Sequence, residues 1–194
     1  MRFYTNIVQW GNNLLLREVV DGERINRKIK YSPTLYARVA KETNYKTLEG
    51  KYVAPIKHDT IKDAKAWAEG YNTQFAYNYV ADEYPNEVPW NIDEILIVTI
   101  DIEVECENGF PKPEDANDPL LSITLKNHQN KKIVVWGIGD FENSRDDVSY
   151  VKCDTEKHLL QSFLTFWEQH KPDVITGWNT EFFDIPYVCN RILN

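Results

Sequence analysis

The chain has 194 residues and a formal net charge of -8, with 42% hydrophobic and 13% aromatic residues. This composition predicts a folded globular protein and excludes a disordered one. No apolar run approaches the roughly 20 residues that a membrane-spanning helix needs, and the first residues lack the apolar core of a signal peptide. We therefore expect a cytoplasmic protein with no membrane partner.

The cysteines and histidines exclude several kinds of site. Cys106, Cys153 and Cys189 are widely spaced, with no Cys-x-x-Cys pair and no partner histidine at zinc-finger spacing, so we expect reduced thiols. The four histidines are scattered through polar segments. Neither a histidine-based metal site nor a Ser-His-Asp triad is predicted.

The charge is distributed unevenly along the chain. Residues 1–65 hold 13 Lys and Arg against 7 Asp and Glu, whereas residues 66–94 hold 6 acids and no base. The excess of +6 in the first segment indicates a basic face, for which RNA or single-stranded DNA is the candidate partner. A mixed, solvated surface is the commoner cause of such counts, and this alternative stays open.

The first half of the chain predicts a small β-rich domain. Strands are expected over 2–8, 13–20 and 24–30, and the Asp21-Gly22 pair between the last two is a strong hairpin signal. Further along, the pattern predicts a strand over 35–39, an irregular polar stretch over 41–55, a helix over 60–69 ended by Gly70, and an aromatic strand over 74–80. The proline-containing, acidic segment 82–93 predicts a linker, which divides the chain into domains 1–94 and 95–194.

The second half predicts a mixed α/β (α+β) domain. Strands are expected over 95–104, 120–126 and 132–138 as an antiparallel meander, followed by a strand over 148–153, a helix over 156–170, a strand over 174–176 and a helix over 185–193. Three antiparallel strands followed by alternating helix and strand is the order of a ribonuclease-H-like fold.

Two acids end the most apolar strand of this domain. The run from Ile95 to Val104 predicts a buried strand, and Asp101 and Glu103 within it point to the same face, roughly 7 Å apart. Their burial and mutual repulsion would make ionisation unfavourable, and a bound divalent cation is the usual compensation. Oxygen ligands of this kind suit Mg²⁺ or Mn²⁺. The alternative is that both acids lie in solvent.

The motifs resemble those of family B DNA polymerases, most closely the T4-like bacteriophage type. Asp101-Ile102-Glu103 is similar to the first exonuclease motif, and Asn179-x-x-x-Phe183-Asp184, after a Thr-Gly-Trp strand, is similar to the second. Gly109-Phe110-Pro111, Pro186-Tyr187 and Asn190-Arg191 also match the pattern in order, and the resemblance covers nearly the whole chain.

The resemblance implies a 3′–5′ proofreading exonuclease portion of a DNA-directed DNA polymerase, acting on a single-stranded DNA 3′ end with two divalent metal ions. It assigns Asp101, Glu103 and Asp184 as metal ligands and catalytic residues. It assigns Phe110, Asn179 and Phe183 to substrate binding. The alternatives are a helix cap for Asp184, core packing for Phe110 and Phe183, and a turn role for Asn179.

The sequence departs from the family pattern at the third exonuclease motif. That motif, Tyr-x-x-x-Asp, supplies a fourth acid, but Arg191 stands four residues after Tyr187. We therefore expect a truncated ribonuclease-H-like exonuclease domain that is inactive alone, either a truncated reading frame or one piece of a split polymerase. The remaining polymerase segment or subunit is then a partner, and the bacterial host cytoplasm is the expected location if a phage encodes it.

Two alternatives stay open from the sequence. A nucleic-acid-binding or regulatory module without catalysis would use the basic excess of residues 1–65. A free-standing exoribonuclease is a lesser alternative, since it would need its own final acid and usually a nearby histidine, and neither follows Asp184.

Overall fold

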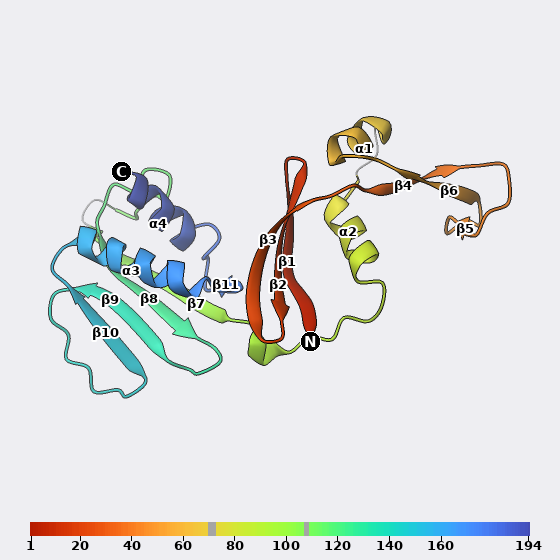
Figure 1. Ribbon diagram of the computed structural model, residues 1–194. Coiled ribbons are helices and arrows are strands. Elements are labelled where there is room, and N and C mark those ends of the chain that lie inside the picture. Colours follow the sequence, from red (N-terminus) through yellow and green to blue (C-terminus); the bar gives the residue numbers. More distant parts are fainter. Residues whose placement is uncertain (70–72, 107–108) are drawn as a thin grey trace. The chain divides into compact units, whose positions relative to one another are not determined.

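A computed structural model describes residues 1–69, 73–106 and 109–194 (Figure 1). The chain divides into two compact units, Met1–Asn91 and Ile92–Asn194. The predicted boundary at residue 94 falls at the end of a short 3₁₀ helix, η1 (Ile92–Glu94). None of the helices in the described ranges combines the length and apolar character needed to cross a bilayer.

The first unit begins with the predicted hairpins. Strands β1 (Arg2–Trp10), β2 (Asn13–Val20) and β3 (Glu23–Lys30) form an antiparallel sheet in that order. The turns contain Gly11, Asp21 and Gly22 with positive φ angles of 59°, 51° and 85°. Glycine and aspartate tolerate this left-handed backbone better than most residues, which explains why these positions end the strands.

A second sheet of this unit corrects one prediction. Strands β4 (Thr34–Arg38), β6 (Tyr52–Lys57) and β5 (Tyr45–Lys46) pair in that order, so the stretch 41–55 is not irregular throughout. Pro55 argues against a strand at the level of the sequence, because proline cannot donate a ladder hydrogen bond, and β6 was therefore not predicted. It is tolerated here because β5 is two residues long and pairs only with Tyr52 and Val53.

Two helices complete the unit, and one of them was predicted as a strand. The predicted helix is α1 (Ile61–Trp67), in which the Thr60 hydroxyl accepts a hydrogen bond from the Asp63 amide at 3.1 Å; its expected end, Gly70, lies outside the described residues. Residues 75–80 lie in α2 (Phe75–Glu83) instead of a strand, and Gln74 is the N-cap of this helix. Phe75 and Tyr79, one helical turn apart, are buried in the same core, so tertiary packing overrides the strand preference of aromatic residues.

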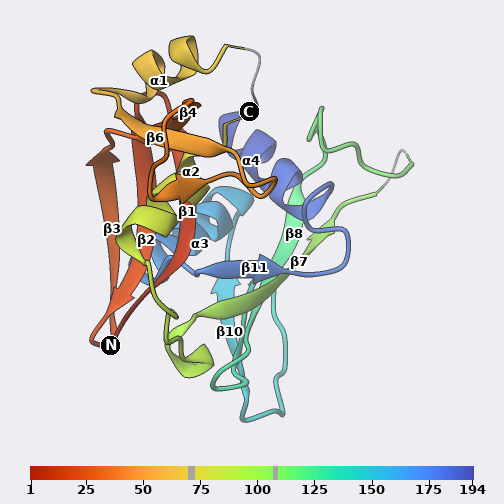
Figure 2. The same ribbon diagram turned by 90° about the vertical axis from the view of Figure 1, so that its right-hand side faces the viewer.

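The second unit is built on one five-stranded sheet (Figure 2). The antiparallel meander is formed by β7 (Ile97–Val104), β8 (Leu120–Asn127) and β9 (Ile133–Ile138), as predicted. β10 (Val148–Cys153) pairs in parallel with β9, and β11 (Val174–Thr176) pairs in parallel with β7. The sheet order is β10-β9-β8-β7-β11, and the mixed α and β class predicted from the sequence is confirmed.

Helices α3 (Glu156–His170) and α4 (Asp184–Leu193) contribute to one hydrophobic core with the sheet. Leu159 and Phe163 of α3, and Tyr187 and Val188 of α4, join buried residues of β7, β8 and β9. Alternate residues of β7, namely Val98, Ile100 and Ile102, face this core. Asp101 and Glu103 therefore lie on the opposite face of the strand.

Candidate functional site

The two acids of β7 share one face, as predicted, but they are exposed rather than buried. The strand alternates between buried and exposed residues, so only one of its faces packs in the core. On β8, Asp101 is paired with Thr124 and Glu103 with Ser122. The prediction of a buried strand was wrong. The run has apolar residues on both faces, which favours burial of both, but only one face of β7 packs in the core.

The neighbouring strand β11 covers only the first part of its edge of β7. β11 pairs with Ile97, Val98 and Thr99 and ends there. The N–H of Ile102, beyond that point, donates instead to Oδ1 of Asp184 at 3.2 Å. A carboxylate thus takes the place of a strand carbonyl, and it joins the start of α4 to the segment of β7 that carries both acids.

Asp184 is buried, with 3% of its surface exposed. Burial raises the pKa of its carboxyl above the usual value; backbone hydrogen bonds, including the one from Ile102, oppose this shift, and the negative charge of Asp101 adds to it. Asp101 is therefore the acid whose charge acts on the Asp184 carboxyl. Phe183, and not Asp184, is the N-cap residue of α4, and the Asp184 side chain accepts a hydrogen bond from β7.

The turn between β11 and α4 depends on Gly177 and Asn179. A Cβ at Gly177 would lie 2.6 Å from the carbonyl oxygen of Ile100 and would also collide with the Thr180 hydroxyl, so only glycine fits here. Asn179 has a φ angle of +58°, and its carbonyl accepts hydrogen bonds from the amides of Phe182 and Phe183 at 3.0 and 2.9 Å. Asn179 therefore has the turn role that the sequence left open, while its side chain remains exposed.

Aromatic side chains gather beside Asp184. The rings of Phe110 and Phe183 are 5.2 Å apart between centroids, at an interplanar angle of 44°. Phe110 is 80% exposed, which excludes the core-packing alternative for it, whereas Phe183 packs partly against the core. Trp178 and Phe182 are 93% and 74% exposed, and sequence reasoning did not single them out although large exposed aromatics are uncommon.

The structure does not bring all the predicted ligands into one cluster. Within residues 1–69, 73–106 and 109–194, no group of three or more His, Cys, Asp or Glu side chains is arranged to hold a metal ion. Asp101 and Asp184 are the two candidates that influence each other, and Glu103 lies on the same strand face as Asp101.

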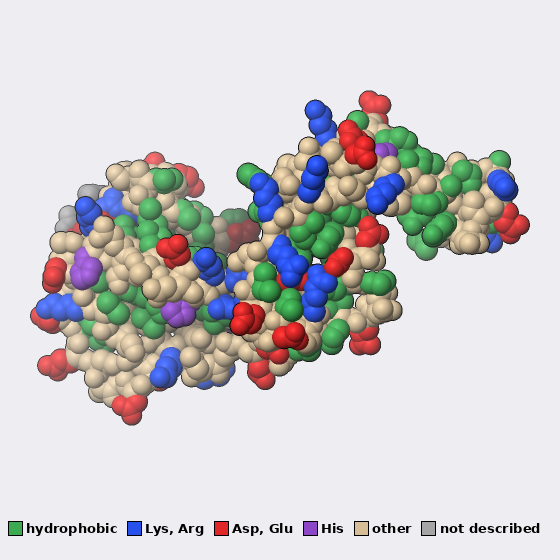
Figure 3. All heavy atoms as spheres, in the orientation of Figure 1, with side chains coloured by type: hydrophobic (Ala, Val, Ile, Leu, Met, Phe, Trp, Pro, Cys, Tyr) green, Lys and Arg blue, Asp and Glu red, His purple; other side chains and the backbone are tan. Residues whose placement is uncertain are grey.

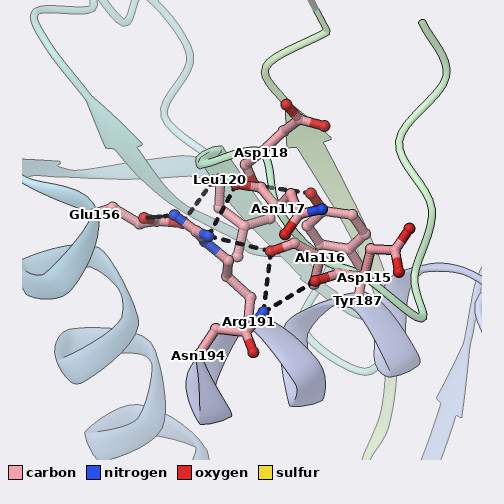
Figure 4. A network of polar contacts seen from close by, with 9 residues as sticks. All are labelled: Asp115, Ala116, Asn117, Asp118, Leu120, Glu156, Tyr187, Arg191 and Asn194. Atoms are coloured by element: carbon pink, nitrogen blue, oxygen red, sulfur yellow. Dashed lines mark hydrogen bonds and ion pairs between the residues drawn. The ribbon is translucent and has the colours of Figure 1, made fainter. Parts of the chain in front are cut away.

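A polar network that the sequence did not reveal holds the loop between β7 and β8 (Figure 4). Arg191 of α4 makes a bidentate ion pair with Glu156 of α3, with both N···O distances 2.7 Å. Its Nη1 donates to the carbonyls of Ala116 and Asn117 at 3.1 Å each. The residue that departs from the third-motif pattern is thus part of this network.

Comparison with known proteins agrees with this architecture. The family model described as "DNA polymerase family B, exonuclease domain" matches residues 55–194. The DNA-directed DNA polymerase of Escherichia phage RB69 is 31% identical, in an alignment that covers 99% of this chain and 25% of that protein. The corresponding enzyme of Enterobacteria phage T4 is 30% identical, with 98% and 25% covered.

A more distant relative, a DNA polymerase of Pyrococcus glycovorans, is 26% identical over 89% of this chain and 20% of its own length. The chain spans about a quarter of the length of the two phage polymerases. Both exonuclease-like motifs read from the sequence lie within the range that the family model matches. The chain therefore belongs to the exonuclease-domain family of family B DNA polymerases.

Proposed function

We propose that the unit Ile92–Asn194 binds the 3′ end of single-stranded DNA and provides carboxylates for metal-dependent 3′–5′ hydrolysis. The observation that carries this proposal is the buried Asp184 carboxylate, fixed by the Ile102 amide beside the strand that holds Asp101 and Glu103. Buried carboxylates whose pKa is raised by burial and by a second acid are typical of functional sites.

The residues fit Mg²⁺ or Mn²⁺. Asp101, Glu103 and Asp184 offer only oxygen donors, which these ions prefer. The charge of Asp101 also disfavours ionisation of Asp184, and a divalent cation would relieve this repulsion. When bound, two such ions lower the pKa of the attacking water and stabilise the charge that develops on the phosphate. When metal is bound, Asp101 and Glu103 of β7 and Asp184 at the start of α4 would be its carboxylate ligands.

The aromatic pair provides the contact to the substrate base. Phe110 is exposed and lies against Phe183, the residue immediately before Asp184. A base that stacks on this pair needs no particular sequence, because every base has an aromatic face. Asn179 and Phe182 line an open hollow beside the end of β11. This position favours a contact between the Asn179 side chain and the substrate.

We propose further that the 194-residue chain supports little cleavage by itself. Support comes from the described residues, among which no three acids are arranged as a metal-holding cluster. The remaining polymerase segment or subunit is the proposed partner that completes the site. The relatives are about four times as long as this chain, so polymerisation is a property of those proteins.

The test uses the whole chain and an oligonucleotide with a fluorescent base at its 3′ end. We expect binding that requires Mn²⁺ or Ca²⁺ and that weakens in Asp101→Asn and Asp184→Asn, together with little cleavage in Mg²⁺. An Asp146→Asn variant, which changes an exposed loop acid, is the matched control. Binding that ignores the metal and both site variants would refute the site, and robust cleavage abolished by Asp101→Ala would refute the inactivity of the isolated chain.

A second candidate function concerns the first unit, as a binding surface for RNA or single-stranded DNA. Tyr36 and Tyr45 are 49% and 47% exposed, with ring centroids 5.2 Å apart. Strand register places Arg38 and Lys57 on the same face of the β4-β6-β5 sheet. Stacking aromatics flanked by cations are typical of single-strand binding surfaces.

Other basic side chains of this unit support the mixed-surface alternative. Arg2 and Arg27 form ion pairs with the buried Glu18, and Figure 3 shows Lys and Arg side chains interspersed with Asp and Glu. Filter binding of RNA and single-stranded DNA at several salt concentrations distinguishes a nucleic-acid-binding surface from a mixed, solvated one. The binding surface is supported if the affinity of the wild type falls as salt rises and if Tyr36→Ala binds more weakly than the wild type. Undetectable or salt-independent binding excludes it.

A further inference from the structure

Side chains on one face of α4 donate hydrogen bonds to backbone carbonyls of the loop between β7 and β8 (Figure 4). Beside the two bonds from Arg191, Tyr187 Oη donates to the Asp118 carbonyl at 2.8 Å and Asn190 Nδ2 donates to the Pro113 carbonyl at 2.8 Å. Asn194 Nδ2 donates to the Asp115 carbonyl at 3.0 Å. The loop is therefore fixed to the helix over its second half.

Arg191 is the centre of this arrangement. Its guanidinium is divided between the Glu156 carboxylate and the carbonyls of Ala116 and Asn117. Glu156 Oε1 also accepts the Leu120 amide at 2.7 Å, at the first residue of β8. Only a planar guanidinium has enough donors in a fixed geometry to serve all three acceptor groups at once, and lysine cannot replace it.

The loop conformation needs such support. Ala116 is fully buried and has a φ angle of +42°, a left-handed conformation that is unfavourable for residues with a Cβ. Its carbonyl accepts from Arg191 at 3.1 Å and from Asn194 at 3.4 Å. These donors stabilise a backbone conformation that the loop sequence alone does not favour.

The other end of the same loop carries Phe110, which lies against Phe183 at the start of α4. The helix thus positions Asp184 at its first turn and the Phe110 loop along its length. We expect a displacement of the loop to move Phe110 relative to Phe183, whereas Asp184 is held separately by the Ile102 amide.

We propose that Arg191 is a positioning residue that fixes Phe110 over Phe183 and so sets the stacking site for the 3′-terminal base. This inference rests on the proposed function for the identity of the ligand. The positioning itself is a property of the chain and can be measured without DNA.

The first measurement is amide hydrogen exchange of the whole chain. Three amides report on the loop, because Asp115 and Ala116 donate to the Lys112 carbonyl and Leu120 donates to Glu156. We expect Arg191→Lys to lower their protection by about tenfold or more while the α3 amides keep theirs. Arg145→Lys is the matched control, because Arg145 forms an exposed ion pair with Asp147 that does not touch the loop.

The second measurement is affinity for a single-stranded oligonucleotide with 2-aminopurine at its 3′ end. Loss of one stacking aromatic in Phe110→Ala should raise Kd by about tenfold, within the range of base–aromatic stacking. Arg191→Lys should raise Kd by about fivefold in the wild type, yet less than twofold when Phe110→Ala is already present. That non-additivity distinguishes positioning of Phe110 from general destabilisation.

Asn194→Ala, which removes an uncharged donor to the Asp115 and Ala116 carbonyls, provides a second variant if Arg191→Lys fails to fold. Unchanged loop protection in both variants would overturn the proposal, and so would additive effects of Arg191→Lys and Phe110→Ala. A wild-type chain that does not bind the oligonucleotide would instead refute the proposed function, and the exchange measurement alone would then decide the role of Arg191.

Discussion

The Asp184 carboxylate accepts a hydrogen bond from the Ile102 amide at 3.2 Å, and this bond joins the first residue of α4 to the strand that carries Asp101 and Glu103. Asp184 therefore has both a structural role and a chemical role. Its Oδ1 satisfies a backbone donor that β11 does not reach, while the charge of Asp101 adds to the rise in the pKa of its carboxyl.

Removing the acceptor at this position should destabilise the fold. Asp184→Ala leaves the buried Ile102 amide without a partner, and we expect a loss of about 1–3 kcal/mol in the free energy of unfolding. Asp184→Asn keeps an acceptor oxygen for the amide and is the matched control. Urea denaturation of the three proteins measures the difference; equal stability of the alanine variant and the wild type would show that the bond contributes nothing.

The asparagine variant should also behave differently with pH. Because burial raises the folded-state pKa of Asp184, stability falls as the pH rises from the unfolded-state pKa through the folded-state pKa, and the effect is absent in acid below both. Asp184→Asn should therefore be more stable than the wild type at neutral pH without metal, and this advantage should disappear at low pH. A constant difference across the pH range would contradict the raised pKa.

Glycine at position 177 is required by a backbone contact. We expect Gly177→Ala to lower the free energy of unfolding by about 1–3 kcal/mol, because the new Cβ meets the Ile100 carbonyl of β7. Gly137→Ala is the matched comparison, since the three atoms nearest to its Cβ would all belong to the Tyr150 side chain and not to the backbone. Thermal unfolding should show the larger loss for Gly177→Ala, and an equal loss for both would exclude a special role for the β11 turn.

The ion pair between α3 and α4 should give an acid-sensitive contribution to stability. Burial opposes the ionisation of Glu156, but the Arg191 guanidinium and the Leu120 amide outweigh it and hold the pKa of Glu156 below its usual value. Glu156→Gln should cost about 2 kcal/mol at neutral pH. The difference from the wild type should shrink as the pH falls through the folded-state pKa, because the stabilisation exists only while the carboxylate is ionised. Denaturation curves at several pH values test this; a pH-independent difference would contradict it.

Sequence periodicity predicted the second unit well because its strands and helices carry strong local signals. The α3 range was predicted residue for residue, and Asp101 and Glu103 were placed correctly on one strand face. Helix α2 was missed because its burial depends on packing with Tyr31, which is remote in sequence. The network of Arg191 and Glu156 joins residues 35 positions apart, and no local pattern indicates such a pair.

Mn²⁺ binding by the whole chain, followed by electron paramagnetic resonance, decides whether the β7 acids and Asp184 form a metal site. We expect saturable binding by the wild type and by the control Asp146→Asn. We expect affinity at least about tenfold weaker in Asp101→Asn and in Asp184→Asn, because each variant removes a charged ligand. Binding that is equally strong in all four proteins would contradict the assignment of the β7 acids and Asp184 to a metal site.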